Sequence, residues 1–272
     1  MTSDTERAFL DFDEKESRRV EAIYQTPDVV AQRARVLDAL ALRPGERVVD
    51  LGCGPGLLAS QMAQCVGPEG EIECIDASGS MVALARHRCT PLNWVHLRVG
   101  DVAALPYADR GFDAAVCTQV YEYLPELDRA LAHLYRVLRP GGRAVIVDTD
   151  WESCVWHSSD PARMRRMLDA WDRHCPQPQL PRTLAARLQA VGFESVRVDA
   201  ITLINDRYDS NTYSFSMIPV IAGYAAKHGL VSGAEVEAWV ADLQALGRGR
   251  DYFFSLNRYS FMARKPATAA GQ

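Results

Sequence analysis

The feature that most constrains the fold is a regular alternation of short apolar runs and helical patterns between residues 47 and 148. The apolar runs have the length of strands, and the stretches between them repeat apolar residues at helical spacing. The predicted strands are 47–51, 71–76, 94–99, 112–118 and 144–148, and the predicted helices between them are 57–65, 79–89 and 125–138. Because this alternation is typical of parallel strands joined by right-handed helical crossovers, it predicts an α/β fold with a Rossmann-like, doubly wound sheet.

The pattern changes on either side of this alternation. Before it, Thr26 and Pro27 predict the cap and the first residue of a helix. After residue 150 we predict a helix from 160 towards 175, a helix over 183–191, a strand over 195–204, two helices within 205–250 and a last strand over 252–263. The chain is thus expected to have a helical cover (1–45), a core (46–204 and 251–266) and a helical insertion (205–250) that acts as a lid on the substrate side.

Composition and charge exclude several classes of partner. The 272 residues carry a formal net charge of −5 and no basic, aromatic-rich patch, which argues against nucleic acid. No apolar run approaches the ~20 residues of a membrane span, and residues 1–12 lack the apolar stretch of a signal peptide. Seven cysteines without a Cys-x-x-Cys pair indicate reduced thiols. We expect a cytoplasmic protein with a small-molecule substrate and no metal, membrane or nucleic-acid partner; its oligomeric state stays open, with a homodimer as one option.

The strongest functional signal is a glycine-rich loop after the first predicted strand. Asp50-Leu51-Gly52-Cys53-Gly54-Pro55-Gly56 stands between that strand and a predicted helix. Glycines let the backbone turn sharply and approach a ligand without a clash at Cβ. In an open α/β sheet this turn lies at the carboxyl edge, where ligands bind. The loop therefore predicts a ligand site.

Two further acids follow the next two predicted strands. Asp76 ends the second strand, where a carboxylate accepts hydrogen bonds from the hydroxyls of an adenosine ribose. Asp101 follows the third strand in Gly100-Asp101, where a carboxylate accepts from an adenine amino group. Three acids at the tips of three successive strands, at positions 50, 76 and 101, predict one site that binds an adenosyl ligand.

These residues resemble the S-adenosylmethionine (SAM) motifs of class I methyltransferases, in particular those of the UbiE-like small-molecule group. The resemblance covers residues 46–148 and includes the segment 138–142 before the fifth strand. It implies SAM as the cofactor and a seven-stranded sheet with an antiparallel last strand. The cofactor residues that it implies are Tyr24, Arg33, Asp50, Gly52, Cys53, Gly54, Gly56, Asp76, Ala77, Met81, Asp101, Val102 and Gln119.

Within that set, the resemblance assigns residues to different parts of SAM. The loop 52–56 would pass beneath the methionine part, and Asp76 would hold the ribose. Asp101 and Val102 would contact the edge of adenine. Arg33 would reach the SAM carboxylate, which suits an arginine because its guanidinium binds a carboxylate with two parallel donors.

NAD is the rival cofactor. Its fingerprint requires Gly-x-Gly-x-x-Gly, whereas the third glycine of this chain is Gly56 and Leu57 takes the expected place. The pair Gly100-Asp101 has no role in the NAD fingerprint. Both observations favour SAM, and an NAD(P)-binding oxidoreductase is kept as an alternative.

The sequence marks no single catalytic residue. Methyl transfer from a sulfonium needs alignment and exclusion of water, and a base only where the acceptor must lose a proton. Candidate groups near the methyl follow the fourth and fifth predicted strands. We select His157, because imidazole titrates near neutrality, together with Tyr121 and Asp150. Further candidates are Glu122, Tyr123, Asp148, Trp151 and His174, and packing or capping is the alternative role for every candidate.

The segment after the fourth strand, Thr118-Gln119-Val120-Tyr121-Glu122-Tyr123, lacks the Asn/Asp-Pro-Pro-Tyr motif of methyltransferases that act on adenine or glutamine. We therefore predict a biosynthetic, SAM-dependent transferase that methylates O, N or C of a small-molecule metabolite by in-line displacement. The alternative is a protein of the same fold that binds SAM or its product, S-adenosylhomocysteine (SAH), without catalysis.

Overall fold

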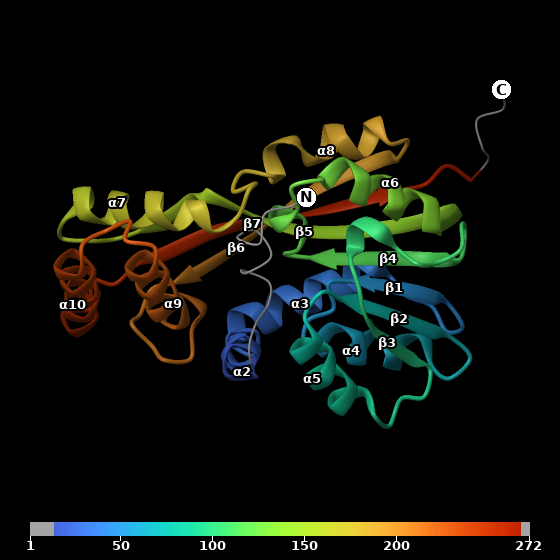
Figure 1. The fold of residues 1–272 in the computed structure, drawn as a ribbon, viewed down its shortest axis with the longest axis horizontal. Helices are drawn as coiled ribbons and strands as arrows, with labels where there is room; N and C mark the ends of the chain where they lie inside the picture. The colour runs from blue at the N-terminus through green and yellow to red at the C-terminus, as the bar shows by residue number, and fades with distance from the viewer. Residues whose placement is uncertain (1–13, 268–272) are drawn as a thin grey trace.

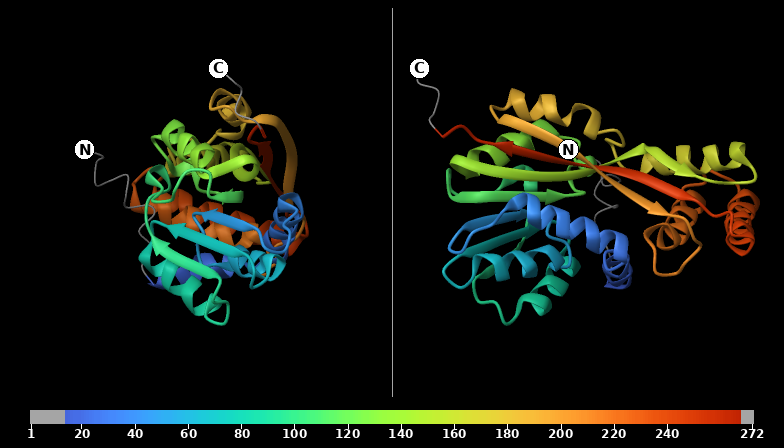
Figure 2. Two further views of the ribbon diagram at one scale, coloured as in Figure 1. Left: turned by 90° about the vertical axis from the view of Figure 1, so that its right-hand side faces the viewer. Right: turned by 180° about the vertical axis from the view of Figure 1, so that it is seen from behind.

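The computed structural model describes residues 14–267, and a seven-stranded sheet in the order β3-β2-β1-β4-β5-β7-β6 forms its centre (Figure 1 and Figure 2). Strand β7 is antiparallel to its neighbours β5 and β6, and the other pairs are parallel. The strands are β1 (Arg47–Leu51), β2 (Glu71–Asp76), β3 (Val95–Val99), β4 (Phe112–Thr118), β5 (Leu138–Trp156), β6 (Glu194–Asn205) and β7 (Phe254–Arg264). The predicted doubly wound sheet with an antiparallel last strand is confirmed.

Helices cover both faces of this sheet. They are α2 (Glu14–Ile23), α3 (Pro27–Leu40), α4 (Leu57–Val66), α5 (Gly79–Cys89), α6 (Leu127–Val137) and α8 (Pro181–Ala190). Helices α6 and α8 pack on one face through Leu131 and Leu184, whereas α3 and α4 pack on the other through Leu40 and Met62. Strand β4 lies between these two apolar layers and is buried along nearly all of its length, which explains its continuous apolar sequence.

Strand β5 is much longer than the predicted strand over 144–148. It continues to Trp156, where it still pairs with Phe254 of β7. The sequence prediction missed this extension because it contains acidic residues. A buried acid needs a polar partner, and the local sequence does not show one. Asp150 is buried, and its carboxylate accepts two hydrogen bonds of 2.9 and 3.0 Å from Arg182.

The extended ends of β5, β6 and β7 carry three helices away from β1, β2 and β3 (Figure 1). We call these helices, α7 (Pro161–Trp171), α9 (Tyr213–Lys227) and α10 (Gly233–Gly249), the helical lobe. Its core contains four buried indoles, those of Trp151, Trp156, Trp171 and Trp239. Helices α9 and α10 are the two helices that the sequence predicted within 205–250.

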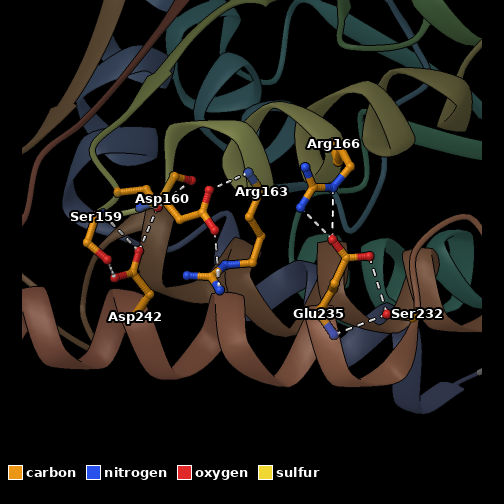
Figure 3. A network of polar contacts seen from close by, with 8 residues as sticks. Ser159, Asp160, Arg163, Arg166, Ser232, Glu235 and Asp242 are labelled. Atoms are coloured by element: carbon orange, nitrogen blue, oxygen red, sulfur yellow. Dashed lines mark hydrogen bonds and ion pairs between the residues drawn. The ribbon is translucent and has the colours of Figure 1, made fainter.

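Polar contacts join α7 and its preceding loop to α10 (Figure 3). Asp242 on α10 accepts hydrogen bonds from Ser158 Oγ at 2.6 Å and from the backbone N–H of Ser159 at 3.1 Å. About two turns nearer the start of α10, Glu235 forms an ion pair with Arg166 of α7 at 2.5 Å. The two helices are thus held together at separate points along their length.

Thr26 lies directly before α3, as predicted, but its side chain does not cap that helix. Its hydroxyl donates instead to the carbonyl of Ile23 at the end of α2, at 2.8 Å, and this carbonyl also accepts from Thr26 N at 3.2 Å. Asp28, in the first turn of α3, binds residues far away in the sequence. Its Oδ2 accepts from Asn205 Nδ2 at 2.9 Å and from Tyr213 N at 3.0 Å. This carboxylate ties the N-terminal helices to β6 and α9.

Among residues 14–267, no helix has both the length and the apolar character that crossing a membrane requires.

Candidate active site

A cavity of about 600 Å³ opens at the carboxyl ends of β1, β2, β3 and β4. The loop after each of these strands contributes to its wall, and residues of α3 and the end of α2 close it on the N-terminal side. Its polar and ionisable wall residues include Tyr24, Gln32, Arg33, Asp76, Asp101, Thr118, Gln119, Tyr123 and Glu126. The cavity lies where the strand order reverses between β1 and β4, which is the usual ligand position in an open α/β sheet.

The glycine loop is shaped by close packing of the protein on itself. Gly52 has a φ of +75°, and a Cβ there would lie 2.1 Å from Val120 Cγ2. The backbone N–H groups of Gly52 and Cys53 donate to Ile75 O at 2.7 and 3.2 Å, which holds the loop against β2. Gly54 lines the cavity itself, with a φ of +52°. The loop therefore needs glycine for its own path as well as for access to a ligand.

Asp76 and Asp101 face the same cavity from neighbouring strand ends. Asp76 Oδ2 accepts from Gly54 N at 2.8 Å, and Oδ1 accepts from Ser78 N at 2.9 Å. Burial raises the pKa of Asp76 above its ordinary value, against the lowering effect of these two hydrogen bonds. Asp101 Oδ1 accepts from Ala103 N at 2.8 Å and so begins the short helix η1 (Val102–Ala104).

Asp50, the third predicted acid, lies close to this pair but does not line the cavity. It is buried at the end of β1, and its Oδ2 has no hydrogen-bond partner among the described residues. Burial, with a further contribution from the charge of Asp76, raises the pKa of Asp50 to about 7. Gly56 also lies outside the lining, because its ideal Cβ position is 2.9 Å from Ala85 Cβ of α5.

The other residues predicted to hold the cofactor line the cavity. They are Tyr24, Arg33, Gly52, Cys53, Gly54, Asp76, Ala77, Met81, Asp101, Val102 and Gln119. Arg33 Nη1 donates to the carbonyl of Tyr24 at 3.0 Å, and burial lowers the pKa of this arginine. Gln119 adopts a φ of +56°, and its Nε2 lies 3.4 Å from Thr149 Oγ1.

The three residues selected as catalytic do not line this cavity. Tyr121 is fully buried in the apolar layer beside α6. Asp150 pairs with Arg182, and His157 is exposed beyond β5, where its backbone N–H donates to Phe253 O at 2.9 Å. The extension of β5 carries Asp150 and His157 away from the strand end at which the sequence placed them. Their catalytic role stays a prediction, and this placement gives it no support.

The insertion also differs from the predicted lid in its position. No residue of 205–250 lines the cavity. Helices α9 and α10 pack with α7 around the buried indoles of the helical lobe, so their apolar residues serve that core. Only the start of α9 approaches the site, where the Tyr213 ring lies 4.6 Å from the Arg258 guanidinium carbon.

Sequence reasoning missed two residues on the α3 side of the cavity. Gln32 lines it, and its position on α3 between Val29 and Val36 was a usable signal, since all three residues share one helical face. Arg258 on β7 is fully buried and donates through Nη1 to Gln32 Oε1. No local signal marks Arg258, because its partners come from distant parts of the chain.

No group of His, Cys, Asp and Glu side chains suited to hold a metal ion occurs in the part of the chain that the structure describes.

Comparisons with known proteins agree with this geometry. A sequence profile of the methyltransferase domain matches residues 48–142. The ubiquinone/menaquinone biosynthesis C-methyltransferase UbiE of Bordetella avium is 31% identical over 180 residues, which are 59% of this chain and 69% of that protein. The match spans only 34% to 48% of the length of several other curated relatives.

Two solved structures extend the similarity beyond the profile. The (4+2)-cyclase SpnF is 25% identical, with a TM-score of 0.57 over 88% of this chain and 82% of that chain. Phosphoethanolamine N-methyltransferase 2 of Haemonchus contortus, solved in complex with SAM, is 19% identical, with a TM-score of 0.64 over 97% of this chain and 61% of that chain. The second likeness concerns the fold alone. The sequence similarity to UbiE, the matching domain profile and the shared fold together show that this chain belongs to the class I SAM-dependent methyltransferases.

Proposed function

We propose that this protein transfers the methyl group of SAM to a small-molecule acceptor. One observation carries the proposal: two carboxylates from neighbouring strands, Asp76 and Asp101, face a single cavity beside the glycine loop. Such a constellation suits an adenosyl ligand, because the two acids can accept from its ribose hydroxyls and its adenine amino group. The family to which the chain belongs uses SAM as its cofactor and supports the same activity.

The residues around the cavity fit the parts of SAM. Asp76, held by two backbone donors, suits the ribose hydroxyls. Met81 and Val102 are nearly buried and offer apolar surfaces to adenine. Arg33 Nε is buried without a hydrogen-bond partner among the described residues, and this open donor suits the carboxylate of the amino-acid part.

When bound, SAM supplies a methyl group on a sulfonium, which is already a good leaving group. The protein then has to align the acceptor and exclude water. Tyr24 helps by covering the glycine loop, with its Cε2 3.9 Å from the ideal Cβ position of Gly54. The hydrogen bond from Arg33 to the Tyr24 carbonyl fixes that cover to α3. Gln119, just beyond β4, and Gln32, on α3, line the part of the cavity that we take as its acceptor end.

The size of the cavity supports a small acceptor. Its volume of about 600 Å³ falls within the ~300–1,000 Å³ of ordinary small-molecule sites, and the cofactor itself fills part of it. The acidic net charge of the chain argues against nucleic acid as the substrate. The proposal includes O, N and C as acceptor atoms.

Labelled transfer tests the proposed function. The protein is incubated with SAM that carries an isotope-labelled methyl group and with a fractionated metabolite extract, and products are read by mass spectrometry. We expect one metabolite to gain the labelled methyl group with wild-type protein and none with heat-inactivated protein. Binding of SAH without any labelled product would overturn the transferase proposal.

That contrary result would favour a second function, binding of SAM or SAH without methyl transfer. The likeness to a protein described as a cyclase favours keeping this option, because it shows that the same fold occurs with another named activity. The NAD alternative is tested in the same series by thermal shift. Stabilisation by NADH but not by SAH would replace both SAM-based functions with an oxidoreductase.

A further inference from the structure

Two buried carboxyl groups lie behind the acceptor end of the cavity. Glu122, in the short helix η2 (Tyr121–Tyr123), and Asp148, in β5, are both fully buried. The backbone N–H of Glu122 lies 3.4 Å from Asp148 Oδ1, and Glu122 Oε2 accepts from Thr149 N at 3.0 Å. Neither carboxyl group lines the cavity, so neither belongs to the cofactor residues described above.

One oxygen of Glu122 is available to receive a proton. Oε1 is buried and makes no hydrogen bond of good geometry with the described residues. The donors that face Glu122 are the Tyr123 hydroxyl and the Trp151 indole. Tyr123 also lines the cavity. A single tyrosine side chain therefore stands between the cavity and a buried acid.

The surroundings of Glu122 set its affinity for protons. Burial raises its pKa to about 7, against the lowering effects of the Thr149 N–H, the Arg258 guanidinium and the two side-chain donors. Burial and the charge of Glu122 together raise the pKa of Asp148 well above its ordinary value. The groups that face Glu122 are Asp148 and Trp151 on β5, Arg258 on β7, Tyr24 after α2, Tyr213 on α9, Cys117 on β4, and Cys175.

Two neighbouring groups, Asp148 and Arg258, set how readily Glu122 can act as a general base. The charge of Glu122 raises the pKa of Asp148 and so disfavours a second negative charge beside it, and the Arg258 guanidinium lowers the pKa of Glu122 by stabilising its carboxylate. A base is most effective when its pKa lies near the working pH. Its natural partners are hydroxyl groups that ionise without great cost, such as phenols and enols, rather than aliphatic alcohols.

We propose that Glu122 accepts, through the hydroxyl of Tyr123, the proton of a phenol- or enol-type hydroxyl on the methyl acceptor. The proposal rests on the proposed function and names its substrate class. The acceptor O–H gives its proton to Tyr123 Oη, while the Tyr123 proton passes to Glu122 Oε1. The acceptor oxygen forms a bond to the methyl carbon, and the sulfur–carbon bond breaks with its electron pair left on sulfur. Tyr123 ends neutral and Glu122 ends protonated, and Glu122 later returns the proton to solvent by the same path.

Kinetics of three variants test this relay, with the acceptor identified by labelled transfer. Glu122→Gln keeps the shape of the side chain, and its amide oxygen can still accept from Thr149 N–H. We expect unchanged SAH affinity by calorimetry, a kcat about 100- to 10,000-fold lower with little change in KM, and loss of the acidic limb of the pH profile. Tyr123→Phe is expected to lower kcat in the same way.

Asp172→Asn is the matched control. Asp172 is a half-buried carboxyl group whose pKa is also raised by burial, to about 6, but it does not line the cavity. We expect this variant to keep the wild-type kcat and pH profile. An acceptor without an acidic hydroxyl, or a Glu122→Gln protein with wild-type kcat and pH profile, would overturn the relay.

Infrared spectra of the SAH-bound protein give a readout that needs no turnover. We expect the neutral carboxylic acid band to include a component of Glu122 that fades near pH 7. The difference spectrum between wild type and Glu122→Gln isolates this component, because the bands of Asp50, Asp148 and Asp172 remain in both proteins. In Tyr123→Phe the band should persist to higher pH, because the carboxylate has lost a donor. An unchanged titration in Tyr123→Phe would contradict the relay. Absence of any labelled product from the wild type would contradict the proposed function instead, and the infrared titration would still decide whether Tyr123 and Glu122 are coupled.

Discussion

At the scale of single residues, two aspartates at adjacent strand ends have different environments. Asp76 lines the cavity and is held by two backbone N–H groups, whereas Asp50 is buried beneath the glycine loop with one oxygen unpartnered among the described residues. We therefore expect the same residue type to serve ligand recognition at position 76 and to affect mainly stability at position 50. Two predictions separate these roles.

The first prediction concerns Asp76. Asp76→Asn loses a charged acceptor and disturbs the hydrogen bond that holds Gly54, so we expect SAH affinity to fall about 10- to 100-fold in a calorimetric titration. Glu73→Gln is the control, because Glu73 lies on the same strand but does not line the cavity. Equal Kd values for Asp76→Asn and wild type would remove Asp76 from the cofactor site.

The second prediction concerns pH and Asp50. Because the folded pKa is raised to about 7, folded protein binds more protons at this group than unfolded chain does between about pH 4 and 7. This stabilising contribution is complete below the unfolded pKa and is lost as the pH rises through the folded pKa. We expect Asp50→Asn to gain roughly 2–3 kcal/mol in unfolding free energy relative to wild type between pH 5 and pH 8. Urea unfolding of both proteins at pH 5 and pH 8 measures this difference. If the unfolding free energies of Asp50→Asn and wild type changed equally between the two pH values, the prediction would be contradicted.

At the scale of elements, the site depends on how tightly the loop after β1 packs against the loop after β4. Gly52 is the point of closest approach, where a Cβ would collide with the Val120 side chain. Two backbone N–H groups in this loop also donate hydrogen bonds to the carbonyl of Ile75, near the end of β2. The loop is thus fixed by its neighbours on both sides before any ligand binds.

A glycine substitution tests this packing. Gly52→Ala places a Cβ at 2.1 Å from Val120 Cγ2 and at a positive φ, so we expect a loss of roughly 1–3 kcal/mol in stability and weaker SAH binding. Gly79→Ala is the matched control, since a Cβ there meets no atom within 4 Å at the start of α5. Thermal unfolding and calorimetry compare the two. A Gly52→Ala protein as stable as Gly79→Ala would mean that the loop is not packed as described.

The sequence predicted those elements whose signals are local. Strands β1 to β4 were recognised because each is a short, mainly apolar run. Four residues that line the cavity, Gly52, Gly54, Asp76 and Asp101, were found because they stand at strand ends. The long β5 was missed because burial of Asp150 depends on Arg182, which lies 32 positions away. The acceptor end was missed for the same reason, since its groups come together only through the fold.

At the scale of the whole molecule, the two halves of one sheet support different parts of the structure. Its parallel half, β1 to β4, presents the cavity, and its antiparallel half extends into the helical lobe (Figure 1). The carboxylate of Asp28 links the two halves by bonding to Asn205 and Tyr213, beside the buried cluster of Glu122 and Arg258. The proposed acceptor end of the cavity is thus expected where the two halves meet.

A crystal structure of the protein with SAH tests the central claim most directly. The account predicts density in the cavity between β1 and β4, with Asp76 within hydrogen-bond distance of the ribose hydroxyls and Asp101 beside adenine. SAH bound elsewhere on the molecule, or bound with its ribose away from Asp76, would contradict it.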